Sequence, residues 1–208
     1  AGRFGCDLRR TCDPVPGTLG GIADPHADLP FLGFFKLTMA RNVEIKAKIG
    51  GIEALIPIIA SLAETGPFNI LQHDTFFNCP LGKLKLRAFS ASSGELIFYQ
   101  RPELNGPKVS LYQISPTTEP DSLRDALALA YGILGTVRKQ RTLYLLGKTR
   151  IHLDRVDGLG DFLELEVVLE DLQTITYGES IALDLMAKIG VSPNQLIPTS
   201  YLELLSKS

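Results

Sequence analysis

The chain has 208 residues, of which 45% are apolar and 21% are charged, a composition typical of a globular protein with one or two domains. Its formal net charge of -2 argues against a protein that coats nucleic acid, and no apolar run reaches the roughly 20 residues that a membrane helix needs. We therefore expect neither a nucleic-acid partner nor a membrane partner.

Residues 1–38 differ from the rest of the chain. They are rich in proline and glycine and show no sustained hydrophobic periodicity. We expect a flexible leader that is not part of the fold, followed by a single domain over residues 39–208. The cysteines Cys6, Cys12 and Cys79 are too few to form a disulfide framework, which favours a reducing, cytoplasmic location. The pattern leaves the oligomeric state open.

Hydrophobic periodicity predicts the elements that follow the leader. Residues 42–49 alternate strictly between polar and apolar side chains, as in a half-buried strand. Pro57 interrupts the first helical pattern, which therefore contains either a kink or a late start. The expected helices cover residues 52–64, 121–134, 179–189 and 200–206, and the further expected strands cover 69–78, 82–90, 95–102, 107–115, 136–146, 148–156 and 161–169.

Eight strands joined by short links predict an α+β fold with an antiparallel sheet. A sheet of this size can form an eight-stranded antiparallel closed β-barrel with helices packed outside, because closure removes the sheet edges. The stretch Gly158-Leu159-Gly160 lies between two strand patterns, and we interpret it as a hairpin turn rather than a cofactor-binding loop.

Charged residues recur on one face of most of these strands. Lys83, Lys85 and Arg87 alternate with leucines, and Glu164 and Glu166 alternate with apolar residues. For any single strand, the simplest interpretation is a face turned to water. The alternative is a closed sheet that turns its charged faces inward. Such a lumen would bind anions and, through its carboxylates, a hard divalent cation, which together describe a receptor for a polyphosphate.

The ordered set of motifs resembles the CYTH family, also called triphosphate tunnel metalloenzymes. Asn-Val-Glu-Ile-Lys at 42–46 is similar to the Glu-x-Glu-x-Lys signature of that family, and the class IV adenylyl cyclase-like branch is the most similar. The further matching stretches are Gln-His-Asp-Thr-Phe-Phe (72–77), Gly-Lys-Leu-Lys-Leu-Arg (82–87), Tyr-Gln-Arg-Pro (99–102), Gly-Pro-Lys-Val-Ser (106–110), Lys-Gln-Arg (139–141), Arg-Ile-His-Leu-Asp (150–154) and Gly-Leu-Gly-Asp-Phe-Leu-Glu-Leu-Glu (158–166).

The resemblance implies a tunnel with a bound Mg²⁺ or Mn²⁺ and a small-molecule triphosphate. It implies Lys46 and Asp154 as catalytic residues. Asn42 departs from the pattern, because the family has a glutamate there, and this puts one metal site in doubt. The implied metal ligands are Glu44, Glu164 and Glu166, and the implied phosphate-binding residues are Lys85, Arg87, Arg101, Lys108, Lys139, Arg141 and Arg150.

The resemblance favours a metal-dependent phosphohydrolase that acts on inorganic tripolyphosphate or on an organic triphosphate such as thiamine triphosphate. A class IV-type adenylyl cyclase, which makes cyclic AMP and pyrophosphate from ATP, is the alternative. A non-enzymatic domain that binds polyphosphate or nucleotide is the third candidate. The paired Glu164 and Glu166 favour an enzyme, since a binding protein would need only the cations.

Overall fold

The computed structural model describes residues 40–100 and 108–207, except for a few side chains at the ends of these ranges. The elements, in chain order, are β1 (Ala40–Lys48), α1 (Ile56–Leu62), β2 (Thr65–Phe77), β3 (Lys83–Ser90), β4 (Ser93–Gln100), β5 (Lys108–Thr117), α2 (Pro120–Tyr131), β6 (Ile133–Leu146), β7 (Thr149–Val156), β8 (Gly160–Leu169), α3 (Ile175–Ile189), a short 3₁₀ helix (Pro193–Gln195) and α4 (Tyr201–Leu205). The expected α+β class, with an eight-stranded antiparallel sheet and helices, is confirmed.

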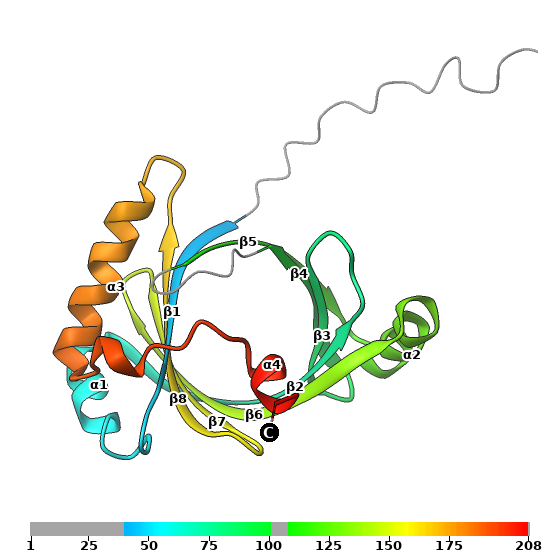
Figure 1. The fold of residues 1–208 in the computed structure, drawn as a ribbon, viewed down its shortest axis with the longest axis horizontal. Coiled ribbons are helices and arrows are strands. Elements are labelled where there is room, and N and C mark those ends of the chain that lie inside the picture. Colours follow the sequence, from blue (N-terminus) through cyan, green and yellow to red (C-terminus); the bar gives the residue numbers. More distant parts are fainter. Residues whose placement is uncertain (1–39, 101–107, 208) are drawn as a thin grey trace, which may run out of the picture. The chain divides into compact units, whose positions relative to one another are not determined.

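Every strand pairs with two antiparallel neighbours. The order is β1-β5-β4-β3-β2-β6-β7-β8, and β8 pairs again with β1, so the sheet is a closed barrel (Figure 1). Closure leaves every strand with a neighbour on both sides, which satisfies the backbone groups that an edge would expose. The turn predicted at residues 158–160 is confirmed as the β7–β8 hairpin, where Gly158 and Gly160 take positive φ angles of 77° and 87°.

The main apolar core lies between the barrel wall and the helices α1 and α3. Val43, Ile45 and Ala47 of β1 point outward and pack in one cluster with Leu185 and Ile189 of α3. Figure 1 shows α1 and α3 outside the ring, beside β1 and β8. The alternation at residues 42–49 is thereby explained, because the apolar residues pack under the helices and the polar residues face the interior of the barrel.

The helix boundaries differ from the expected ones for local reasons. The first helix starts late, at Ile56, so that Pro57 occupies its first turn, where a missing N–H costs no hydrogen bond. Helix α2 stops at Tyr131, because Gly132 turns the chain with a φ of 72°. Helix α3 starts earlier than expected and contains Gly178. A Cβ there would come within 2.7 Å of a Val43 methyl group, so the glycine permits close packing on β1.

No helix in the described part of the chain combines the length and the apolar character needed to cross a membrane.

Candidate active site

A cavity of about 380 Å³ lies inside the barrel, and all eight strands contribute to its wall. The lining residues alternate along each strand, as in Asn42, Glu44 and Lys46 of β1. Alternate residues of a strand point to the same face. The polar faces of these strands therefore turn into the barrel. Of the two alternatives drawn from the sequence, the inward-facing one holds for the lining side chains, and the water-facing one is wrong for them.

The first cationic group consists of Lys85 and Arg87 on β3, which bind the carboxylate of Asp74 on β2. Arg87 donates from Nε to Oδ1 at 2.7 Å and from Nη2 to Oδ2 at 2.8 Å, and Lys85 donates to Oδ2 at 2.9 Å. Burial alone would raise the pKa of Asp74, but the two cations hold it far below its ordinary value. Burial, aided by the neighbouring Arg87, lowers the pKa of Lys85 to about 8.

The second cationic group repeats this arrangement on β6 and β7. Arg141 binds Asp154 through Nε at 2.7 Å and Nη2 at 2.6 Å, and Lys139 donates to the same carboxylate at 2.7 Å. The Tyr201 hydroxyl adds a fourth contact at 3.1 Å. Asp154 is 0% exposed and lies behind the cations, outside the described lining of the cavity. Its position is that of a residue that holds Lys139 and Arg141 in place.

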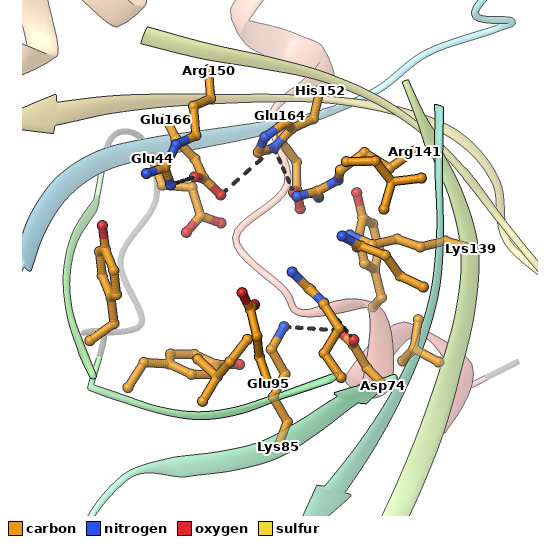
Figure 2. A pocket seen from close by; sticks show the side chains of 18 of the residues that line it. Glu44, Asp74, Lys85, Glu95, Lys139, Arg141, Arg150, His152, Glu164 and Glu166 are labelled. Atoms are coloured by element: carbon orange, nitrogen blue, oxygen red, sulfur yellow. Dashed lines mark hydrogen bonds and ion pairs between the residues drawn. The ribbon is translucent and has the colours of Figure 1, made fainter. Parts of the chain in front are cut away.

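The acidic group lies on β8, between β1 and β7. In the strand register, Glu166 stands opposite Glu44 of β1 and Arg150 of β7. Like charges directly opposite each other destabilise a sheet unless a cation compensates them. Arg150 supplies one compensating contact, with its Nη1 3.2 Å from Glu166 Oε2. Figure 2 shows Glu44, Glu166 and Arg150 together on one wall, with Lys85 and Asp74 on the facing wall.

Glu164 is the most heavily paired carboxylate of this group. Lys46 Nζ lies 3.1 Å from its Oε1, and Arg141 donates to its Oε2. Burial would raise the pKa of Glu164, but Lys46, Lys139 and Arg141 hold it well below its ordinary value. Lys46 also lies 4.0 Å from the centre of the Tyr201 ring, which packs under its ammonium group. Lys46 is thereby fixed at the acidic wall.

Three buried side-chain atoms in the described part of the chain have no hydrogen-bond partner. They are Asn42 Oδ1, Gln72 Oε1 and His152 Nδ1. All three residues line the cavity. Leaving a buried polar atom unpaired costs about 1–3 kcal/mol, so these atoms are poised to bind a ligand or ordered water.

The residues suggested by the resemblance fall into three groups in the structure. Arg101 and the side chain of Lys108 lie outside the described residues. Asp154 lies behind the wall. The remaining ones line the cavity: Glu44, Lys46, Lys85, Arg87, Lys139, Arg141, Arg150, Glu164 and Glu166.

The sequence interpretation did not assign a role to Asp74, His152 or Tyr201. His152 shares its strand face with Arg150, so alternation alone could have indicated it. Asp74 could not be paired with Arg87 without the register of β2 against β3. Tyr201 comes from the C-terminal helix α4, for which periodicity gives no direction relative to the barrel.

The chain is similar in sequence to known proteins over nearly all of the described part. The profile of the CYTH domain matches residues 40–201. The protein named adenylate cyclase CyaB of Aeromonas hydrophila is 26% identical over 176 residues, which are 80% of this chain and 90% of the relative.

Solved structures resemble the barrel at lower sequence identity. The PH1012 protein of Pyrococcus horikoshii has a TM-score of 0.70 at 22% identity, covering 78% of this chain and 98% of its own. The HpAC1 protein of Hippeastrum, described as having a dominant triphosphatase activity, has a TM-score of 0.57 at 15% identity, covering 81% and 96%. At these identities, the likeness shows a shared fold.

Proposed function

The chain belongs to the CYTH domain family, and from this premise we propose that it is a metal-dependent hydrolase of a triphosphate. One observation carries the proposal: six cationic side chains and four glutamates converge on one cavity. The cationic ones are Lys46, Lys85, Arg87, Lys139, Arg141 and Arg150, and the glutamates are Glu44, Glu95, Glu164 and Glu166.

The cations suit a chain of phosphates. Arginine presents a planar fork that matches two phosphate oxygens, and lysine supplies a point charge. The two cationic groups lie on β3 and β6, with β2 between them, so they line a continuous stretch of the wall. In the proposed complex, their positive charge binds the phosphates and stabilises the charge that grows on the phosphoryl oxygens.

The donor set of the acidic wall fits a divalent cation. Carboxylates of Glu164 and Glu166 lie together there, and the unpaired atoms of Asn42 and His152 line the same cavity. When bound, Mg²⁺ or Mn²⁺ would neutralise phosphoryl oxygens and make phosphorus more susceptible to attack. Lys46 lies at this wall and is proposed to orient the attacking water.

The proposed reaction is attack of water on a terminal phosphorus, with cleavage of its bond to the bridging oxygen. The products are a diphosphate and inorganic phosphate. The chain's part is to bind the phosphates in line with the water and to exclude bulk solvent from the cavity.

Adenylyl cyclase activity is the second candidate, and two observations favour it. The Aeromonas relative is named an adenylate cyclase. Phe89, Tyr99 and Tyr112 also line the cavity, and aromatic rings can stack on a purine. A cyclase must direct the ribose 3′-hydroxyl at the α-phosphorus, whereas a hydrolase needs only the phosphates and one water.

A product assay separates the candidates. The full chain is incubated with tripolyphosphate, ATP or thiamine triphosphate, each with Mg²⁺ or Mn²⁺, and the products are resolved by ion-exchange chromatography. We expect phosphate release from tripolyphosphate and little cyclic AMP from ATP. A Glu164→Gln preparation controls for contaminating phosphatases. Cyclic AMP and pyrophosphate as main products, with tripolyphosphate untouched, would support the cyclase, and binding without turnover would support the non-enzymatic alternative.

A further inference from the structure

The imidazole of His152 converges with two carboxylates on the acidic wall. Its Nδ1 lies 3.7 Å from Glu166 Oε1 and 3.8 Å from Glu164 Oε2. One ligand atom from each of the three residues lies within 4.8 Å of the others. Ligand atoms about 2.1 Å from a metal ion can be up to about 4.2 Å apart, so separations of 3.7 Å and 3.8 Å suit atoms that share one ion.

His152 Nδ1 is in a position where it needs a partner. The residue is 3% exposed, and its Nδ1 is one of the three buried atoms without a hydrogen bond in the described residues. Both carboxylate separations are longer than an ordinary hydrogen bond. Figure 2 shows the ring directed toward Glu164 and Glu166 rather than away from the cavity. A metal ion between these atoms would satisfy the nitrogen.

The basic residues around the two carboxylates contact Glu164 and Glu166 differently. Lys46 contacts Glu164 on Oε1, and Arg150 contacts Glu166 on Oε2. The opposite oxygens, Oε2 of Glu164 and Oε1 of Glu166, are the ones nearest to His152, although Arg141 also donates to Oε2 of Glu164. Both oxygens of Glu164 are therefore paired with a lysine or arginine, whereas Glu166 has its described arginine contact on Oε2 and directs Oε1 toward the imidazole.

We propose that His152 is a metal ligand through Nδ1, and that it forms with Glu164 and Glu166 a mixed nitrogen–oxygen site. The inference rests on the proposed metal-dependent function and specifies its metal. Magnesium binds almost entirely through oxygen, whereas imidazole suits first-row transition-metal ions. The site therefore favours Mn²⁺ over Mg²⁺.

The test uses the full chain, freed of metal by chelation and kept without phosphate compounds. Mn²⁺ is titrated by electron paramagnetic resonance to obtain the Kd, and pulsed measurements on the bound ion detect any directly coordinated ¹⁴N. The variants are His152→Gln and His152→Ala. His73→Gln is the matched control, because His73 lies on β2, opposite Ala88 of β3, and is not among the described residues that line the cavity.

We expect a ¹⁴N coupling in the wild type that is absent from both His152 variants. The Kd for Mn²⁺ should rise by at least about tenfold in these variants, since even loss of an outer partner of a ligand costs roughly 10–100-fold. Mg²⁺ should displace Mn²⁺ poorly from the wild type and more easily from the variants. The His73→Gln protein should match the wild type in all three measurements.

The wild-type spectrum decides the inference even where a variant does not fold. Bound Mn²⁺ without a ¹⁴N coupling would overturn it, and failure to bind Mn²⁺ would also overturn it. The product assay tests the proposed function separately. Hydrolysis with Mg²⁺ and no ¹⁴N coupling would leave that function standing without this ligand, whereas a ¹⁴N coupling without turnover would leave the metal site standing without the hydrolase.

Discussion

Asp74 and Asp154 hold two lysine–arginine groups in the same way at two places in the barrel. Each aspartate stands directly opposite an arginine of the adjacent strand, in the pairs Asp74–Arg87 and Asp154–Arg141. Each receives two hydrogen bonds from that arginine and one from the lysine two residues before it. The repeated geometry indicates that both carboxylates fix cations whose charge would otherwise be unpaired inside the barrel.

Replacement of Asp74 tests this relationship. In Asp74→Asn, Lys85 and Arg87 lose their buried counter-charge, and removing one partner of a buried ion pair costs about 3–5 kcal/mol. We expect a clearly lower Tm in buffer without polyanions. Tripolyphosphate should raise the Tm of the variant more than that of the wild type, because both cations are then free to bind it. Differential scanning fluorimetry measures both effects.

The matched control is Asp184→Asn, which breaks an exposed pair between Asp184 and Lys188 on α3. Surface pairs contribute about 0–1 kcal/mol, so this variant should melt close to the wild type. An Asp74→Asn protein as stable as the control would show that Asp74 does not serve as the counter-charge.

Arg87 and Arg141 should be sensitive to replacement by lysine. Both use the guanidinium fork on a buried aspartate, which a lysine cannot reproduce. We expect Arg87→Lys and Arg141→Lys to lower the Tm and to shrink the rise in Tm produced by tripolyphosphate. Silent substitutions at both positions would mean that only the overall positive charge matters there.

Arg150 should behave differently from Arg141. Its side chain is 41% exposed, and the structure describes one contact to a carboxylate, at 3.2 Å from Glu166. Arg150→Ala should therefore destabilise the fold by about 1 kcal/mol or less, because its half-exposed ion pair is weak but its loss leaves Glu44 and Glu166 facing each other. Isothermal titration should nevertheless show weaker binding of tripolyphosphate, because a cation on the cavity wall is lost. A large drop in Tm would identify Arg150 as a mainly structural residue.

Glu164 and Glu166 should be needed for activity to a similar degree but for stability to different degrees. Glu164→Gln and Glu166→Gln should each lower the metal-dependent rate by on the order of tenfold or more. Glu164→Gln should also lower the Tm, because Lys46 and Arg141 both bind that carboxylate. Rate assays with Mn²⁺ and melting curves test the two statements, and full activity in both variants would remove the metal assignment.

The strands were predictable from the sequence because alternation is a local property. Residues 42–49 indicated β1 and placed Asn42, Glu44 and Lys46 on one face, as the structure has them. The direction of that face was not predictable from one strand, since a wet face and an inner face of a barrel carry the same pattern. The motif order resolved the choice by its resemblance to a known family, and the lining of the cavity agrees.

Pairings between strands could not be predicted in the same way. The distribution of charges gave no sign that Lys85 and Arg87 would bind Asp74, because the contact depends on the register of two strands that a turn of variable length connects. Asp154 shows the same limit. Alternation along β7 placed Asp154 on the inward face. Only its contacts with Tyr201 and the two cations show that its side chain lies behind the cavity wall.

The expected boundary between leader and domain stays a prediction. Among the described residues, the first element is β1, which begins at Ala40. A chain that begins at Met39 should therefore keep the Tm and the activity of the full chain. Melting curves and rate assays on both proteins check this, and a loss of more than a few degrees would assign residues 1–38 a packing role.

Lys85 has a pKa of about 8, below that of an ordinary lysine, because of burial and the adjacent Arg87. Above this pH, the folded protein carries a neutral amine where the unfolded chain still carries an ammonium. Below about pH 8, burial of the charged ammonium lowers the free energy of unfolding. Between about pH 8 and pH 10.5, the folded protein has lost this charge while the unfolded chain keeps it, so the free energy of unfolding rises with pH. The affinity for a polyanion changes with pH in the opposite direction and falls as the pH rises, because binding requires the ammonium form.

We therefore expect the affinity for tripolyphosphate to fall relative to that of Lys85→Arg as the pH rises through about 8. A guanidinium stays charged throughout this range, and the ratio of the two Kd values cancels the titration of the ligand itself. The ratio should change by roughly tenfold, which corresponds to about 1.4 kcal/mol and is close to the value of one hydrogen bond to a charged group. Isothermal titration across the range measures it. A ratio independent of pH would show either that Lys85 does not contact the phosphates or that it keeps its proton throughout.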